Sequence, residues 1–502
     1  MQAIKPFIPF FSFLFYTIYS KPAQASLDQD INELTAPLAI WVKSIVFYKL
    51  SIFGTAVPLV VLWLVIGAIF FTFYLGWINF KAFKHAIELV KGDYDHPESH
   101  GEVSHFQALA TAVSGTVGIG NIGGVAVAVT LGGPGATFWL ICAGILGMST
   151  KFVECTLSVK YRDTFEDGHV SGGPMYYLNY GLKSLGYKKF GRFLGMIYAV
   201  GILLGALGIG NLFQSNQAYE QLVSVWGDSI QPVWVGIGLA LLVLSVILGG
   251  IKSIAKVTEK IVPFMAILYC VSALTVILFN ASYLPAAIQA IFVGAFTGEG
   301  VTGGALGVMV IGFQRAVFSN EAGIGSASIA HSAVKTDEPV TEGVVALLEP
   351  FIDTIVICTI TALVITTSQL ADPQFAGEAK GVAMTSAAFA RHISWFPYPL
   401  ALAAVLFALS TMISWSYYGL KGWTYLFGEQ HFGQMIYKVI FCFFVFLGPL
   451  MKLGPILDIS DALVFLICIP NILGLYILAP VVKQEMNAYF ARIANGEIKK
   501  YK

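Results

Sequence analysis

The chain has 502 residues, 57% of them hydrophobic and only 12% charged, and its formal net charge is zero. A soluble domain carries about twice this share of charged residues, and no basic excess points to nucleic acid. Apolar runs of spanning length, about 20 residues, recur along the chain, and the mean hydropathy is +0.75. We therefore predict an all-α polytopic membrane protein, because a transmembrane barrel would show short alternating segments instead.

The first 25 residues have the features of a secretory signal peptide. Lys5 precedes an apolar run, and Ala23-Gln24-Ala25 offers a small-residue cleavage site. The alternative, an uncleaved extra helix, is disfavoured by two early prolines. Cleavage would leave 26–105 as a periplasmic segment, a peripheral transmembrane helix and a cytoplasmic loop.

Eleven apolar spans follow, with bounds good to a few residues. They are 53–77, 106–129, 135–159, 193–215, 232–250, 261–280, 303–331, 343–367, 398–420, 435–451 and 459–482. Lys and Arg are retained in cytoplasmic loops. With the mature N-terminus outside, 21 of these residues lie in inner segments, Arg315 among them, and six in outer ones. We expect this topology, with the 483–502 tail in the cytoplasm, in a bacterial inner membrane.

The second span contains a glycine cluster at residues 114–124, SGTVGIGNIGG. Glycine costs a helix about 1 kcal/mol relative to alanine, and non-helical backbone at membrane depth is tolerated only where protein or a cavity covers it. The alternative is close helix packing through small residues. A packing seam repeats at every fourth position, whereas these glycines cluster beside the amide of Asn121, so a helix break is favoured.

A second such segment, residues 318–327 (FSNEAGIGSA), interrupts the span 303–331. Each interrupted span is followed by four more, so 106–280 and 303–482 form two five-helix repeats of opposite orientation. Two discontinuous helices in corresponding places indicate an inverted-repeat transporter with its site at the midplane. Exposed N–H groups at such breaks attract anions and exposed carbonyls attract cations, so one site suits a zwitterion with a sodium ion beside it.

Five blocks then identify a family. GTVGIGNIGGVA, GGPGATFW, SGGPMYYL, FSNEAGIGSASIAH and FIDTIVICTITALVI occur in this order, and from about residue 50 to its end the chain resembles the sodium:alanine/glycine symporter family. The resemblance implies a leucine-transporter-type fold with five plus five helices and one extra N-terminal helix. It also implies cotransport of small neutral amino acids, alanine and glycine, with sodium.

The resemblance assigns a substrate site to eight residues. The amides of Ile119 and Gly120 are expected to bind the substrate carboxylate, and carbonyls around Thr116 and Phe318 to face its ammonium group. The other four residues are expected to complete the wall of the pocket, and they are Gly123, Gln214, Thr411 and Trp415. Gly123 and Trp415 are expected to limit the size of the substrate. For Gln214 the alternative is a bond to a neighbouring helix, and for Trp415 it is helix packing.

A sodium site is expected where the first break meets the span 398–420. Its ligands would be the Thr411 and Ser414 hydroxyls and the carbonyls of Ser114 and Val117. The alternative is that these hydroxyls bond back to their own helix. Asn121 is either a further cation ligand or a structural residue.

Buried charges and cysteines receive structural interpretations. Glu321 is expected to cap its break or pair with Arg315, and Asp353 and Glu154 to satisfy buried donors or gate the inner side. His331 is expected to make a loop contact near the inner mouth. The six cysteines lie in or next to apolar spans without a CxxC pair, which is typical of small hydrophobic residues.

The predicted function is secondary active transport by alternating access, with sodium as the coupling ion and no other cofactor. Proton coupling is the nearest alternative. An enzyme is disfavoured because no paired catalytic constellation occurs, and a channel or sensor because rings of charge are lacking. The expected partners are a small neutral amino acid, sodium and the lipid bilayer, with the protein a monomer and no nucleic acid bound.

Overall fold

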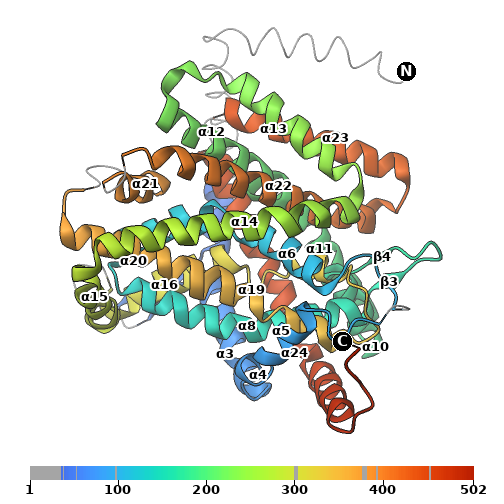
Figure 1. Ribbon diagram of the computed structural model, residues 1–502. Helices are drawn as coiled ribbons and strands as arrows, with labels where there is room; N and C mark the ends of the chain where they lie inside the picture. The colour runs from blue at the N-terminus through green and yellow to red at the C-terminus, as the bar shows by residue number, and fades with distance from the viewer. Residues whose placement is uncertain are drawn as a thin grey trace, which may run out of the picture.

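The computed structural model describes residues 36 to 501 with short gaps. The gaps are residues 38, 53, 97–98, 299–302, 376–380, 392–393 and 452–453. The expected signal peptide, 1–25, lies outside the described residues, so its cleavage remains a prediction. Figure 1 shows a bundle of helices, with α12, α13 and α23 at one end and α4, α5 and the C-terminus towards the other.

A short hairpin and a peripheral helix open the described chain. The hairpin pairs β1 (Lys49–Ile52) with β2 (Thr55–Pro58), and α3 (Leu59–Tyr74) follows it. Helix α3 packs on α8 and α24. Two short helices, α4 (Ile78–Lys81) and α5 (Phe83–Val90), then lie across the end of the bundle.

The first five-helix set begins with the interrupted helix. Helix α6 (His105–Thr116) ends at the glycine cluster, and the chain continues through a π-helical turn into α7 with a bend of 53° between the two halves. The remaining elements of this set are η2 (Gly120–Gly124), α7 (Val125–Gly132), α8 (Ala136–Lys160), α11 (Lys188–Leu207), η4 (Gly208–Leu212), α12 (Phe213–Trp226), α13 (Pro232–Ile247) and α14 (Gly250–Phe279).

The second set begins with α16 (Gly304–Asn320), which stops at Glu321 and resumes as α17 (Ala327–His331). Both predicted helix breaks are therefore present. The later elements of this set are α18 (Pro339–Val345), α19 (Leu348–Pro350), η7 (Phe351–Cys358), α20 (Thr359–Ala371), α22 (Pro397–Phe427), α23 (His431–Leu447) and α24 (Pro455–Ala494).

Connecting segments contain more structure than the apolar spans predicted. A hairpin and short helices follow α8: β3 (Asp163–Thr164), β4 (Val170–Ser171), α9 (Pro174–Tyr176), η3 (Tyr177–Gly181) and α10 (Leu182–Ser184). Two further helices, α15 (Leu284–Thr297) and α21 (Val382–Ala390), lie between the predicted spans. Helix α12 also continues to Trp226, beyond the predicted span end at 215.

Seven of the described helices are long and apolar enough to cross a membrane, and the bent α6–α7 pair makes an eighth. Shorter apolar helices include α3 and α13, of 16 residues each. The predicted total of eleven spans, the repeat boundaries at 106–280 and 303–482 and the inverted relation of the repeats remain predictions.

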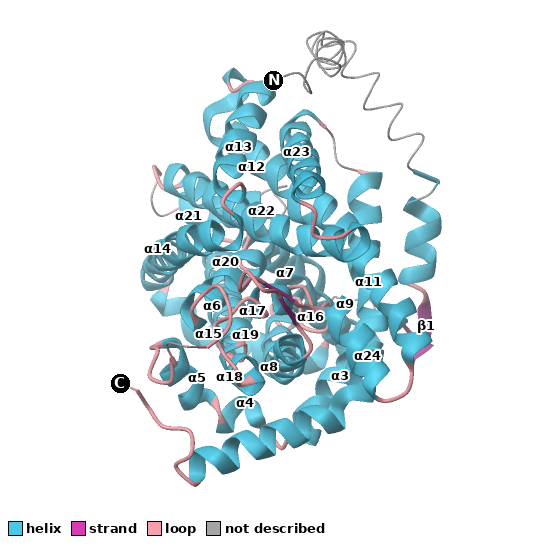
Figure 2. Ribbon diagram, turned by 90° about the vertical axis from the view of Figure 1, so that its right-hand side faces the viewer, coloured by secondary structure: helices cyan, strands magenta, loops and turns pink. Residues whose placement is uncertain are grey.

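One face of the bundle is formed by α5, the β3–β4 hairpin and the chain end, and we call it the C-terminal face. Tyr501 N donates to Asp93 O at 2.8 Å, and Lys500 Nζ lies 3.0 Å from a Glu88 carboxylate oxygen. The chain end therefore returns to α5 (Figure 2).

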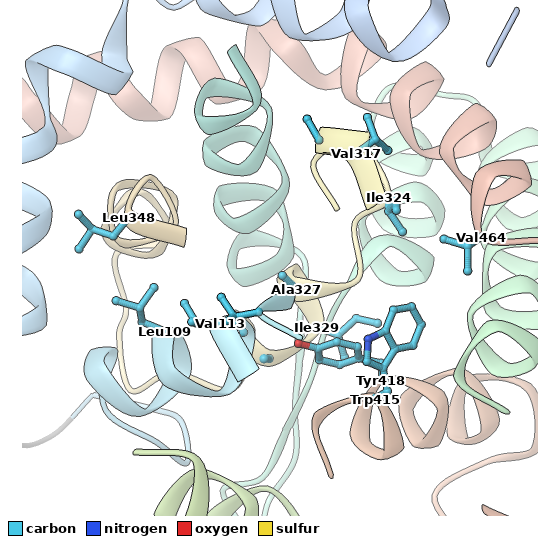
Figure 3. Packing of buried hydrophobic residues seen from close by; sticks show 14 of the residues in the cluster. Leu109, Val113, Val317, Ile324, Ala327, Ile329, Leu348, Trp415, Tyr418 and Val464 are labelled. Atoms are coloured by element: carbon cyan, nitrogen blue, oxygen red, sulfur yellow. The ribbon is translucent and has the colours of Figure 1, made fainter. Parts of the chain in front are cut away.

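The buried core lies between the two interrupted helices and α22 (Figure 3). Val113 of α6, Ala327 of α17 and the rings of Trp415 and Tyr418 of α22 gather there. A Cβ at Gly115 would lie 2.7 Å from Tyr418 Oη, so the glycine allows α6 and α22 to approach closely. This contact positions the site described next.

Candidate functional site

A cavity of about 290 Å³ lies between the two helix breaks. It is bounded by η2 and the ends of α6 and α16, with α22 and α12 beside it. All eight predicted substrate residues line it: Thr116, Ile119, Gly120, Gly123, Gln214, Phe318, Thr411 and Trp415. The structure thus brings together residues from four segments that are far apart in the sequence.

At the first break the backbone leaves the helix at Val117, which has an extended ψ of 102°. The Gly118 amide donates to the Asn121 side-chain oxygen at 2.8 Å. A Cβ at Gly120 would lie 3.7 Å from the Phe318 carbonyl oxygen. Backbone of the first break therefore faces backbone of the second across the cavity.

The second break turns through three residues with positive φ: Glu321, Gly323 and Gly325. A Cβ at Gly323 would lie 2.4 Å from the Leu64 side chain, so both conformation and space require glycine there. Ser326 donates a hydrogen bond to the Glu321 carboxylate, which also lines the cavity. Glu321 therefore bonds within its own break, as the capping interpretation expects.

Buried side chains from the surrounding helices satisfy the backbone of the second break. Glu154 accepts from the Gly323 amide at 3.0 Å, Asn471 donates to the Gly323 carbonyl at 2.9 Å, and Tyr198 donates to the Ile324 carbonyl at 2.9 Å. Glu154 thus satisfies a buried donor, as the sequence suggested. Unpaired backbone groups would be costly at this depth.

The two breaks are joined through Asp353 of η7. Its carboxylate accepts from Ser319 of α16, from Thr354 and from the Asn121 amide, and the Asp353 carbonyl also accepts from Asn121 at 3.2 Å. Both the oxygen and the nitrogen of the Asn121 side-chain amide therefore make hydrogen bonds within the protein. This agrees with the structural alternative predicted for Asn121.

Gln214 and Trp415 form the opposite side of the cavity. The Gln214 amide nitrogen donates to the Ile209 carbonyl at 3.2 Å, whereas its buried oxygen Oε1 has no hydrogen-bond partner among the described residues. Trp415 Nε1 donates to the Gly115 carbonyl at 3.2 Å. A Cβ at Gly210 would lie 2.5 Å from Trp415, so this glycine, missed at the sequence level, makes room for the indole.

Of the four residues predicted to bind sodium, Thr411 and Ser114 are joined by a hydrogen bond, whereas Ser414 bonds to Thr111 of α6. Thr411 Oγ1 donates to the Ser114 carbonyl at 3.1 Å, and Ser414 Oγ donates to the Thr111 carbonyl at 2.9 Å. These bonds join α22 to α6 immediately before Val117, rather than closing back onto α22. The structure therefore places hydroxyl and carbonyl oxygens together at the first break.

A helix outside the predicted spans covers this site. Thr385 of α21 donates to the Ile122 carbonyl at 3.2 Å, and a Cβ at Gly123 would lie 2.8 Å from Val382 of the same helix. Gly123 thus lines the cavity and also supports α21. Nothing in the local pattern of residues 382–390 connects them to the glycine cluster, so this contact was missed.

Two expectations are wrong. The His331 side chain, expected to contact a loop, is instead fully buried and contacts Glu342 of α18, because α17 packs against α6 and α8. Arg315 was counted among inner charges and was an alternative partner of Glu321. Instead it lies over the Phe318 ring at 5.6 Å and lines both the 290 Å³ cavity and a neighbouring one, the latter together with Lys43, an expected outer residue. If Arg315 is counted with the outer residues, 20 Lys and Arg residues remain in inner segments and seven lie in outer ones.

The fold and the cavity define a membrane transporter with a site between two interrupted helices. The profile of the sodium:alanine symporter family matches residues 41–502, and the chain belongs to this family. It is accordingly a transporter rather than an enzyme, in a family that couples amino acids to sodium.

Two relatives and one solved structure illustrate the similarity. The sodium/alanine symporter AgcS of Methanococcus maripaludis is 40% identical over 432 residues, covering 86% of this chain and 94% of the relative. A putative sodium/proton-dependent alanine carrier, YrbD of Bacillus subtilis, is 33% identical over 415 residues, covering 80% and 84%. The crystal structure of MhsT with L-phenylalanine has a TM-score of 0.53 at 16% identity, covering 77% and 88%, and shares the fold.

Proposed function

We propose that the protein takes up small neutral amino acids, alanine and glycine, together with sodium by alternating access. The observation that carries the proposal is the 290 Å³ cavity between two helix breaks. Its volume is at the small end of ligand pockets, which hold about 300–1,000 Å³, and the Trp415 ring walls it. Family membership and the name of the 40% identical relative support alanine.

In this proposal the substrate zwitterion lies between the two breaks. Its carboxylate meets the amides of Ile119 and Gly120, and its ammonium group meets carbonyls around Thr116 and Phe318. The unpartnered Gln214 Oε1 is well suited to accept from the same ammonium group. These proposed ligands are neutral, whereas Arg315, Glu321 and Asp461 add charged side chains elsewhere in the cavity wall.

Sodium is held, in the same proposal, by the Ser114 and Val117 carbonyls and the Thr411 and Ser414 hydroxyls. The hydrogen bond between the Thr411 hydroxyl and the Ser114 carbonyl supports it, because it brings two of these four oxygens together at the α6–α22 contact. One inward charge supplies about 2.3 kcal/mol per 100 mV, whereas tenfold accumulation of substrate needs about 1.4 kcal/mol. One sodium ion per substrate would therefore drive substantial uptake.

The C-terminal face is proposed to lie in the cytoplasm and the mature N-terminus outside a bacterial inner membrane. The Lys and Arg bias supports this orientation. The protein is also proposed to act as a monomer.

The test is uptake of labelled alanine into proteoliposomes with an inward sodium gradient and potential. One parallel sample replaces sodium with potassium at fixed pH, and another imposes only a proton gradient. We expect uptake that requires sodium and is competed by glycine. Uptake driven by protons alone would favour the alternative coupling, for which Glu321 in the cavity wall is the candidate group. Absence of uptake by folded protein would refute the transport proposal.

A further inference from the structure

Six titratable side chains form a buried cluster between the cavity and the C-terminal face. They come from α6, α8, α17, α18 and α19, and each is at most 3% exposed. The members are His105, Lys151, Glu154, His331, Glu342 and Glu349. None of them lines the substrate cavity, and transport as proposed above assigns them no role. Ionisable groups at membrane depth are costly and generally functional.

Ionic contacts connect the cluster to solvent at one end. Asp95, about half exposed, has a carboxylate oxygen 3.7 Å from His105 Nε2. His105 Nδ1 and His331 Nδ1 each contact one oxygen of the Glu342 carboxylate. Alternating carboxylates and imidazoles thus lead inward from the C-terminal face.

The series is interrupted once, between His331 and Glu349. His331 Nε2 lies 3.8 Å from Glu349 Oε2, which is too long for a hydrogen bond. Both atoms are fully buried, and neither has a hydrogen-bond partner among the described residues. Because His331 Nδ1 donates to Glu342, a neutral imidazole would turn an unprotonated Nε2 towards a carboxylate oxygen. A proton on Nε2 would give both atoms a partner.

The local charge also favours an added proton. If Glu154, Glu342 and Glu349 are ionised, they carry three negative charges. The buried ammonium facing them is that of Lys151, whose Nζ lies 2.9 Å from Glu349 Oε1. A buried carboxylate without a counter-charge is strongly disfavoured, and an imidazole that takes up a proton supplies one.

Other charged and titratable groups face the cluster from each neighbouring element. They are His85 on α5, Asp95 before α6, Cys155 and Arg162 on or after α8, Glu321 in the second break, Asp353 on η7, and Tyr417 and Tyr418 on α22. Arg162 itself donates to the carbonyls of Ser332 and Val334 and so is occupied with backbone. The imidazole nitrogen that is both buried and unpartnered in the described part of the chain is His331 Nε2.

The position of this gap connects it with movement. His331 is the last residue of α17, which is the inner half of the second interrupted helix. Glu349 lies on α19 and is fixed through Lys151 to α8. A proton shared between His331 and Glu349 would therefore add a bond from α17 to α19, beside the contact with Glu342 of α18 and the hydrogen bond from Ser158 of α8 to the Ser328 carbonyl.

We propose that the gap between His331 and Glu349 is a proton-binding site reached from the cytoplasm, and that the bound proton holds α17 closed over the inner exit. This inference rests on the proposed transport function and adds to it that α17 moves when substrate is released inwards. Acidification of the cytoplasm then slows uptake, while the same change outside does not act on this site.

The test uses proteoliposomes with a fixed sodium gradient and an outer pH of about 7.5 while the inner pH is set to about 8 or about 6, on either side of the imidazole range. We expect alanine uptake to fall roughly 10-fold at the lower inner pH. His331→Gln should abolish this response, because the amide cannot take up the proton. The matched control His85→Gln, at a histidine of the same face that also contacts a carboxylate, should retain it.

The same pH response in His331→Gln, or none in the unchanged protein, would overturn the proposal. The second result would mean that a neutral pair bridged by water fills the gap. If His331→Gln fails to fold, Glu349→Gln serves instead, because its amide donates to His331 Nε2 without a proton and should also abolish the response.

A direct measurement separates this inference from the transport proposal. Histidine ¹⁵N spectra of the full-length protein, with the His331 signals assigned by their loss in His331→Gln, should show whether Nε2 gains a proton as the pH is lowered. An Nε2 that keeps one protonation state throughout refutes the proton site even if uptake is normal. Absence of sodium-driven uptake at every inner pH refutes the transport proposal and leaves the titration to decide the proton site.

Discussion

The two helix breaks are stabilised in different ways. At the first, the backbone amide of Gly118 bonds to Asn121 a few residues on, and hydroxyls of α22 bond to the preceding carbonyls. At the second, buried side chains of α8, α11 and α24 bond directly to the backbone of Gly323 and Ile324. Both breaks are thus bonded to other helices, but the first combines these bonds with a wall of the cavity, whereas the second is held by buried side chains behind it.

The comparison shows that two glycine-rich helix breaks in one protein can differ in what their glycines do. A Cβ added at Gly124 in the first break would meet nothing within 4 Å, whereas one added at Gly323 in the second would lie 2.4 Å from Leu64. A substitution at Gly323 should therefore affect stability first, whereas one at Gly124, which lines the cavity, should affect ligand binding first. The predictions below test this contrast.

The largest effect is expected for Glu154→Ala. The change leaves the Gly323 amide and the Asn471 side chain without their shared acceptor, and we expect a loss of roughly 3 kcal/mol in the free energy of unfolding. Thermal unfolding in detergent measures it. Glu154→Gln should lose less, because its amide oxygen still accepts.

The control for this prediction is Glu485→Ala. It removes a partly exposed ion pair in which Lys160 Nζ lies 2.7 Å from Glu485 Oε1. Exposed pairs are worth about 0–1 kcal/mol. Equal losses from Glu154→Ala and Glu485→Ala would show that the second break does not depend on its anchor.

A smaller loss, about 2 kcal/mol, is expected for Gly323→Ala, because alanine at a φ of 90° is strained and its Cβ would overlap Leu64. The same substitution at Gly124, where φ is −65°, should leave the unfolding midpoint nearly unchanged. Comparison of the two midpoints checks the contrast between the breaks. A Gly124→Ala variant as unstable as Gly323→Ala would contradict it.

At the first break, Ser414→Ala should raise the sodium concentration needed for half-maximal uptake about 10-fold, which corresponds to about 1.4 kcal/mol. Its hydroxyl bonds across to Thr111 of α6. Ser416→Ala is the matched control, since that hydroxyl donates to Ile413 within α22. If both variants shift the sodium dependence equally, Ser414 has no special part in sodium binding.

The sequence predicted the breaks because a glycine cluster inside an apolar run is a local signal. The family resemblance then grouped Gln214, Thr411 and Trp415 with them, and the structure shows these residues around one cavity. Contacts that arise only when distant helices pack were missed: α21 over Gly123, Gly210 behind Trp415, and the burial of His331 among carboxylates. No local pattern carries such information.

Arg315 illustrates the same limit. Its place near the middle of a predicted span left its side undecided, and the charge count put it inside. The packing of α16 carries this information, because the helix contacts β2 and Arg315 lines one cavity with Lys43 and Asp461. A residue count along the chain does not contain that orientation.

The smallest effect concerns the C-terminal face, away from both breaks. Burial lowers the pKa of His85, which contacts Tyr489 at 2.8 Å and Glu88 at 3.4 Å. The unfolded chain therefore binds more protons than the folded one below an ordinary imidazole pKa of about 6.5. This contribution to stability is present above that pKa and is lost as the pH falls through it.

His85→Gln should accordingly flatten the dependence of the unfolding midpoint on pH between about 8 and 5.5, relative to the unchanged protein. The glutamine can still bond to Tyr489, so the midpoint at the upper pH should change little. An unaltered slope would mean that His85 keeps the same pKa in both states. Because neither break contacts His85 in the described chain, alanine binding should stay the same, which separates the stability of this face from the chemistry of the cavity.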